Sequence, residues 1–226
     1  MFSWRRRARL QRHRRRPMIL SVSAPRFSNR QNQRHELSNG RVLFESRSVA
    51  VTAIVLAREG PSGPFCALVG ERGPRVDKSG TWCLVCGYLD WDESLADAVR
   101  REVFEEAGVD LAALEAAGEA WISKQPLFIQ SDPAAHRQNV TARFLASLSR
   151  LVPLTTEHAE PGEVTQLAWL PLQASAIDEK PWAFHHEEIL HELRAFFDEE
   201  QNQGRANAES PLRFYRRVRD EDSNTV

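Results

Sequence analysis

Runs of apolar residues separated by turn signals predict the strands of one domain. Val49–Leu56 is continuously apolar and rich in β-branched residues, as a buried strand is. Phe65–Val69 is a second such run, and the Gly- and Pro-rich segment 59–64 between them predicts a hairpin. Asn139–Leu148 alternates apolar and polar residues, which predicts a strand with one buried face. Two further strands are expected at Trp82–Cys86 and Val164–Leu170, and strand-like halves flank Pro126 within 121–130.

Helical periodicity is clearest between Glu93 and Ala107. Apolar residues recur there at Leu95, Ala98, Val99 and Val103, so one stripe can face a core. Asp92 or Ser94 can cap the start of this helix, and Gly108 suits the left-handed position after its end. A short helical stretch is expected at 112–117 and a second long helix at 188–197, with the polar cluster 185–188 as its solvated start.

Three carboxylates on this first helix break the local rules. Glu102, Glu105 and Glu106 stand at i, i+3 and i+4, so they share one face near the helix C-terminus. Each like-charged pair costs roughly 0.2–0.5 kcal/mol, and the negative end of the helix dipole disfavours each carboxylate further. A compensating gain is a hard divalent cation, Mg²⁺ or Mn²⁺, which binds carboxylate oxygens. We therefore predict a metal site here.

The same segment resembles the Nudix box, G-x5-E-x7-R-E-U-x-E-E-x-G-U, where U is a large aliphatic residue. All nine specified positions match: Gly87, Glu93, Arg101, Glu102, Val103, Glu105, Glu106, Gly108 and Val109. The resemblance implies an α/β fold, an α/β/α sandwich with a mixed β-sheet, covering roughly residues 42–200. It also implies a hydrolase that cleaves a nucleoside diphosphate linked to another moiety. Val85-Cys86 stands where the family commonly has Pro-Gly, which changes the turn and leaves the acidic part intact.

Roles within the site follow partly from chemistry and partly from the resemblance. Glu105 and Glu106 are the first-choice metal ligands, with Glu102 beside them as ligand or base. By resemblance, the carbonyl of Gly87 is a further ligand and Glu93 supports the metal shell. Arg101 by resemblance anchors a box glutamate, and its spacing also allows a pair with Asp97. Residues from outside the box can complete the site, and these are Glu157, Glu160 and, as first choice, Glu163.

For substrate binding, donors suited to phosphate, sugar or base edges cluster after the first helix. The candidates are Lys124, Arg137, Gln138 and Asn139. Trp82, Trp91 and Trp121 are either stacking platforms for a base or core residues. The expected substrate is a small nucleotide such as ADP-ribose, a nucleotide sugar or a nucleoside triphosphate. Two alternatives stay open: an RNA 5′-end pyrophosphohydrolase, and a regulatory module that binds such a nucleotide without turnover.

Charge is distributed unevenly along the 226 residues. Residues 1–35 contain eleven Arg and no Asp, Glu or Lys, which gives this segment a charge of +11. Because the net charge of the whole chain is −1, the remaining residues carry −12. We expect residues 1–41 to be an Arg-rich extension, 42–200 the Nudix domain and 201–226 a polar tail that frays. The arm at 1–17 is a disordered extension, a polyanion-binding arm that would hold RNA, or an organelle transit peptide.

Cysteine content and hydropathy narrow the class of protein. Cys66, Cys83 and Cys86 form no disulfide framework, and Cys83-x-x-Cys86 lacks the second pair that a zinc site needs, so we interpret these cysteines as small core residues. No run of 18 apolar residues is present, and we expect no membrane span. We predict a cytoplasmic enzyme, and the sequence leaves a homodimer open.

Overall fold

The computed structural model describes residues 32–60, 63–133 and 138–223. They divide into two units, one ending at Ser46 and one beginning at Arg47. In the first unit, β1 (Gln33–Glu36) pairs antiparallel with β2 (Val42–Glu45) through a turn at Gly40. Strand β1 lies within residues 1–41, for which only an Arg-rich extension was expected. The arginine arm at 1–17 lies outside the described residues.

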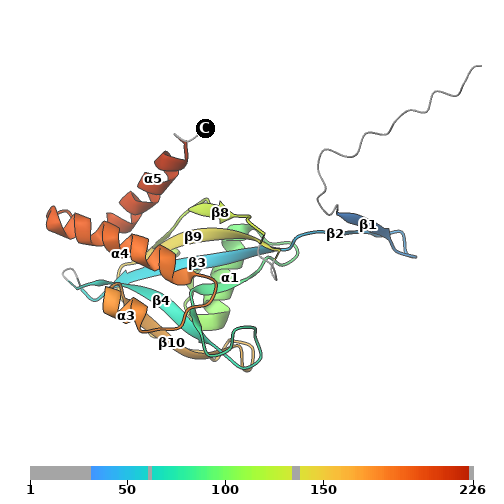
Figure 1. The fold of residues 1–226 in the computed structure, drawn as a ribbon, viewed down its shortest axis with the longest axis horizontal. Helices are drawn as coiled ribbons and strands as arrows, with labels where there is room; N and C mark the ends of the chain where they lie inside the picture. Colours follow the sequence, from blue (N-terminus) through green and yellow to red (C-terminus); the bar gives the residue numbers. More distant parts are fainter. Residues whose placement is uncertain (1–31, 61–62, 134–137, 224–226) are drawn as a thin grey trace, which may run out of the picture. The chain divides into compact units, whose positions relative to one another are not determined.

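The second unit is built on a mixed sheet with the strand order β10-β4-β3-β9-β7, to which β5, β6 and β8 are added (Figure 1). Only the pair β3 and β9 is parallel among the described strands. The strands are β3 (Val49–Arg58), β4 (Phe65–Arg72), β5 (Trp82–Cys83), β6 (Val85–Tyr88), β7 (Ala120–Ile122), β8 (Phe128–Gln130), β9 (Val140–Leu148) and β10 (Val164–Pro171). The predicted strands and the hairpin of β3 and β4 are thereby confirmed.

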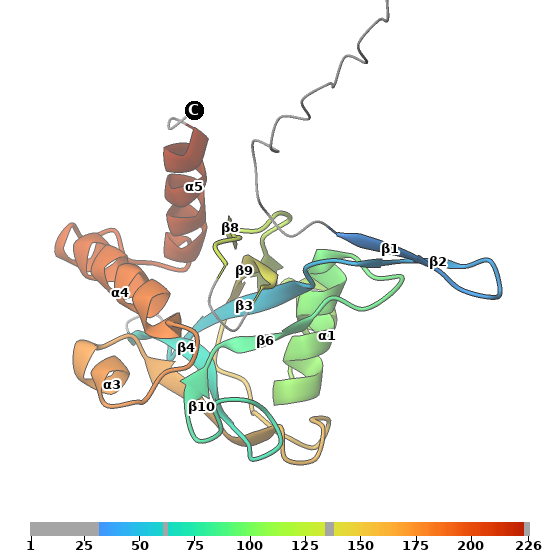
Figure 2. The same cartoon turned by 45° about the vertical axis from the view of Figure 1, so that its right-hand side comes forward.

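Helices cover both faces of this sheet, as Figure 2 shows for α1 on one side and α3 and α4 on the other. The α1 side holds one apolar core, centred on Val51, Val99, Val103 and Phe144. A second core lies between the sheet and the helices α3, α4 and α5, around Ile54, Leu145, Leu190 and Leu193. The helices are α1 (Leu95–Ala107), α2 (Leu111–Ala116), α3 (Ala174–Asp178), α4 (His186–Asn202) and α5 (Ser210–Ser223). The α/β/α sandwich with a mixed sheet is confirmed.

Strand β9 differs from its prediction, because helices pack on both of its faces. Ala142 and Phe144 belong to the α1-side core, while Leu145 belongs to the other core. Arg143, expected on a solvent face, is only 6% exposed. The polar residue in the alternation is therefore inside the protein, and its surroundings are described below.

The C-terminal segment was predicted to fray, and this prediction is wrong. Helix α5 packs Phe214, which is buried, against Phe196 of α4, with 5.3 Å between the ring centroids. The buried carboxylate of Glu200 accepts hydrogen bonds from Arg205, from Arg213 and, at 3.3 Å, from the Ser210 hydroxyl. A polar composition concealed this helix, since its attachment depends on one buried acid.

We expect Glu200→Ala to destabilise the protein by about 3 kcal/mol, because it strands arginines that a buried acid neutralised. Urea unfolding followed by circular dichroism measures the change. Glu199→Ala is the matched control: its partner Arg217 and its own carboxylate are about half exposed, so we expect a change below about 1 kcal/mol. Equal effects of the two substitutions would contradict this account of α5.

Candidate functional site

Helix α1 is fixed at both ends as its sequence predicts. The Ser94 hydroxyl accepts the backbone N–H of Asp97, and Gly108 adopts the left-handed conformation at φ 69°. Val99 and Val103 are fully buried against the sheet. The acidic face of the helix is thereby turned toward β6, where Gly87 lies.

Gly87 is required by the close approach of Glu102. A Cβ placed on Gly87 would lie 2.0 Å from Oε1 of Glu102 and 2.2 Å from its Cδ. The glycine therefore leaves a cradle that this carboxylate fills. Burial raises the pKa of Glu102 to about 7, although Arg101 beside it lowers the pKa.

Arg101 connects the box carboxylates. Its guanidinium donates to Glu93 at 2.8 and 3.1 Å, to Glu102 at 2.8 Å and to Glu105 at 3.0 Å. It also donates to the carbonyl of Tyr88 at 2.9 Å. The alternative pair of Arg101 with Asp97 does not form, since Asp97 pairs with Arg100 instead.

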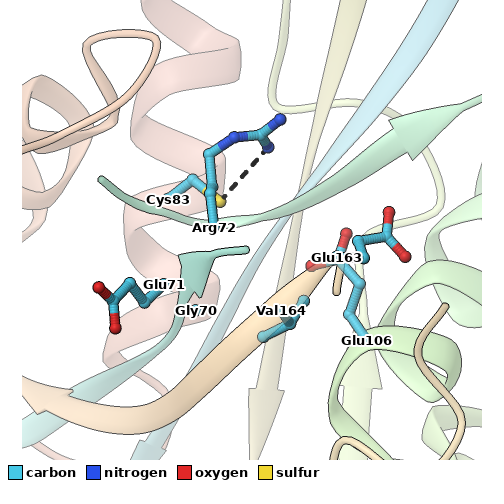
Figure 3. Close-up of a pocket in the computed structure, with 7 residues that line it drawn as sticks. All are labelled: Gly70, Glu71, Arg72, Cys83, Glu106, Glu163 and Val164. Atoms are coloured by element: carbon cyan, nitrogen blue, oxygen red, sulfur yellow. Dashed lines mark hydrogen bonds between the residues drawn. The ribbon is translucent and has the colours of Figure 1, made fainter. Parts of the chain in front are cut away.

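Two further carboxylates lie beside Glu102. Glu106, 5% exposed, accepts the backbone N–H of Cys86 at 3.3 Å. Figure 3 shows its side chain, from α1, next to that of Glu163, which immediately precedes β10. Burial raises the pKa of Glu106 well above its ordinary value, and burial also raises the pKa of Glu163. Among the described residues, neither carboxylate forms an ion pair. Glu163, the first choice from outside the box, therefore lies beside the box residue Glu106, and both line a small hollow. Glu157 and Glu160 do not line this hollow.

These carboxylates are the candidate ligands of a divalent cation. Among the residues that the structure describes, no three His, Cys, Asp or Glu side chains stand close enough to hold a metal as they lie, and Glu102 and Glu105 are hydrogen-bonded to Arg101. The chemistry nevertheless fits Mg²⁺ or Mn²⁺: oxygen donors converge, they are partly desolvated, and two of them lack a cationic partner. Rotation of Glu102 and Glu105 away from Arg101 would complete the set.

A cleft with a volume of about 630 Å³ opens beside these carboxylates. Glu163 and Arg72 line both the cleft and the small hollow at Glu106 that Figure 3 shows. The volume is that of a site for a small molecule. Its floor is the sheet face opposite α1, and its walls come from the segments 76–78 and 184–186 together with Gln130, Asp132 and Asn139.

The wall at the start of α4 is only in part the solvated helix end that was predicted: the side chains of His185 and Glu188 are exposed, whereas that of His186 is not. Phe184 and His185 both have a positive φ, at 59° and 57°, a conformation that is costly for such residues and is characteristic of functional segments. His186 is buried, and its Nδ1 accepts the N–H of Leu84 at 3.0 Å. The guanidinium of Arg72 lies over the ring of Phe184, with 4.8 Å between the guanidinium carbon and the ring centroid.

The predicted substrate residues are mostly elsewhere. Asn139 lines the cleft, as predicted. Lys124 is exposed and does not line it, and the Gln138 carbonyl accepts a hydrogen bond from Arg47. Arg137 lies outside the described residues. Arg72, Tyr88 and Arg143 also line the cleft, and none of them was predicted from the sequence as a substrate-binding residue.

Most of the tryptophans and cysteines considered above pack in the core of the protein. Trp82 and Trp121 pack against the core on the α4 side, whereas Trp91 is 85% exposed. Cys66 and Cys83 are buried, Cys86 is half-buried, and none of the three forms a disulfide. Of the pair Cys83 and Cys86, the interpretation as core residues is confirmed for Cys83, whereas Cys86 is only half-buried.

The α/β/α sandwich with an acidic helix is the architecture expected of a Nudix hydrolase, and solved structures share this fold. The structure is similar to that of the Nudix hydrolase RenU from M. smegmatis (18% identity, 72% of this chain and 92% of that chain, TM-score 0.51). It is also similar to the NUDIX domain of NrtR from Shewanella oneidensis complexed with ADP ribose (22%, 67% and 89%, TM-score 0.52). A third is the bifunctional NMN adenylyltransferase/ADP ribose pyrophosphatase from Francisella tularensis (20%, 67% and 41%, TM-score 0.50). No curated protein matches the chain in sequence.

The family model of the NUDIX domain matches residues 46–193, and the chain belongs to this family. The predictions of a Nudix hydrolase and of its fold are thereby confirmed. No helix in the described part of the chain is long and apolar enough to span a membrane. The cytoplasmic location, the homodimer and RNA binding by the arm stay predictions.

Titration of the acidic cluster should make the stability of the metal-free protein depend on pH. The pKa of Glu102 is about 7 in the fold against an ordinary value of 4.5. Between these values Glu102 is ionised in the unfolded chain and protonated in the folded protein, so its contribution to stability should fall as pH rises from 4.5 to 7 and level off above. The loss from Glu102 is at most roughly 3 kcal/mol.

Urea unfolding in EDTA at pH 5 and pH 8 measures this loss, and Glu102→Gln provides the control. The variant cannot ionise at this position, so its stability should fall less over the same range. An identical pH dependence in variant and wild type would contradict the assignment.

Proposed function

We propose that this protein is a Mg²⁺- or Mn²⁺-dependent hydrolase that cleaves the pyrophosphate linkage of a nucleoside diphosphate joined to a second moiety. The observation that carries the proposal is the convergence of the buried carboxylates Glu102 and Glu106 and the half-buried carboxylate Glu163 beside a cleft of substrate size, which Glu163 itself lines. Isolated from cations, such a cluster is unfavourable, and a bound cation removes the cost.

The residues divide the work of phosphoryl transfer, which depends mostly on positioning and electrostatics. Glu105, Glu106 and the Gly87 carbonyl would hold the metal together with Glu163, and Glu102 is a further ligand or a base for the attacking water. Arg101 and Glu93 orient the carboxylates. When bound, the metal neutralises phosphate charge and lowers the pKa of water.

The cleft supplies what an acidic site lacks toward an anionic substrate. Arg72, Lys78 and Arg143 line it, and cations of this kind bind phosphate oxygens. Two proteins of the same fold are described with ADP ribose as ligand or substrate. ADP-ribose is therefore the first substrate to test, followed by UDP-glucose, GTP and 5′-triphosphorylated RNA.

The test is hydrolysis of this panel by the purified protein with Mg²⁺, with EDTA as the control. We expect turnover of at least one small nucleotide, abolished by EDTA and restored by Mg²⁺ or Mn²⁺. Turnover confined to RNA would favour the 5′-end alternative, and tight binding without hydrolysis would favour the regulatory module. Full activity in metal-stripped protein would refute the metal-dependent mechanism.

A further inference from the structure

The floor of the cleft is a row of residues that the sheet aligns. Thr52 of β3 pairs with Cys86 of β6 on one side and with Arg143 of β9 on the other, and Arg143 pairs with Phe128 of β8. Paired residues project from the same face, here the face opposite α1. Two strand spacings of about 4.8 Å therefore separate the backbone of Arg143 from that of Cys86, whose N–H binds Glu106.

Arg143 is a buried cation without an acidic partner among the described residues. Its side chain is 6% exposed, Nη2 donates to the Gln130 side chain at 2.9 Å, and the guanidinium lies 5.0 Å from the centroid of the Phe128 ring. Nε is buried and makes no hydrogen bond. A buried donor left unpaired costs about 1–3 kcal/mol, and Arg143 lines the cleft, so the fold holds an incompletely paired cation beside the space for a ligand.

The charges around Arg143 leave this donor open. Glu188 and Glu192 of α4 are near enough to raise its pKa, but neither forms an ion pair with it, and burial lowers its pKa overall. Of the other cations that line the cleft, Arg72 pairs with Asp77, whereas Lys78 lies 5.2 Å from the centroid of the Phe184 ring. Among the described cations that line the cleft, Arg143 is therefore the buried one on the floor that can bind an anion without first breaking an ion pair.

We propose that Arg143 is a substrate-binding residue that donates to a phosphate oxygen of the nucleotide from the side of the cleft away from the acidic cluster. The inference rests on the proposed function and specifies the residue that selects a phosphorylated ligand. Gln130 and Phe128 orient the guanidinium at the cleft, and its planar fork of N–H groups matches the oxygens of a phosphate.

Binding of α,β-methylene-ADP tests this without turnover, because a carbon bridges its two phosphorus atoms. Isothermal titration calorimetry with Mg²⁺ compares wild type, Arg143→Lys and Arg143→Met, and adenosine serves as the ligand without phosphate. We expect Arg143→Met to weaken α,β-methylene-ADP at least tenfold and to leave adenosine unchanged. Arg143→Lys, which keeps the charge and loses the fork, should lie between.

Thermal unfolding separates binding from structure. Met preserves the apolar contact with Phe128 and removes a buried charge, so Arg143→Met should melt at or above the wild-type temperature. A lower melting temperature, an equal loss for adenosine, unchanged affinity, or no binding of α,β-methylene-ADP to wild type would each overturn the proposal. If the wild type binds the analogue through Arg143 yet hydrolyses nothing in the panel, this inference stands and the hydrolase proposal fails.

Discussion

Glu106→Gln is expected to reduce kcat/KM roughly 100- to 1000-fold while preserving the fold. The loss of 3–4 kcal/mol in transition-state stabilisation is what removal of one charged ligand from a catalytic cation would cost. The fold should survive because the pKa of Glu106 is raised by burial, so that glutamine resembles its protonated form. The amide oxygen can still accept the N–H of Cys86, as the carboxylate does at 3.3 Å.

Two measurements accompany this variant. Mg²⁺ should raise the melting temperature of the wild type with concentration, since the folded state alone offers the site, and it should do so much less for Glu106→Gln. The control is Glu119→Gln, whose carboxylate is 40% exposed and pairs with Arg150 at 2.9 Å; it should match the wild type in both respects. Wild-type turnover by Glu106→Gln would show that Glu106 is not a metal ligand.

Gly87→Ala is expected to have the second largest effect, with a loss of activity of roughly 100-fold. The new methyl group would fall within 2.4 Å of both Glu102 carboxylate oxygens and must push that side chain out of its cradle. Kinetics on the substrate of the wild type, together with urea unfolding, measure the change.

A double-mutant cycle with Glu102→Ala shows whether the methyl group acts through this carboxylate. With Glu102 shortened, the space is free, so Gly87→Ala should cost far less stability than it does in the wild type. Equal costs in the two backgrounds would mean that the glycine serves the backbone rather than the carboxylate.

The chemistry of the site was legible in the sequence because it lies within one helix and the turn before it. Spacing alone placed Glu102, Glu105 and Glu106 on one face, and helix signals placed both ends of α1. Glu163 was found because its loop precedes a strand, and β10 brings it beside Glu106.

The residues of the cleft floor could not be predicted from the sequence, because the floor depends on pairing between distant strands. Arg143 faces Thr52 only through the parallel register of β3 and β9, and nothing in local periodicity gives that register. An alternating strand implied that Arg143 was solvated, whereas α4 and β8 enclose its face. Lys124 was chosen for its charge, and only the tertiary fold shows that it lies away from the cleft.

The two apolar cores place hydrolysis and recognition under separate structural control. The acidic helix α1 is held by the core on one face of the sheet, while the cleft floor and the start of α4 depend on the other face. Substitutions at Arg143, Phe184 or His185 can therefore change which nucleotide fits without repacking the residues that support Glu102 and Glu106. Such a division lets the substrate range of this domain diversify through the cleft while its catalytic helix stays constant.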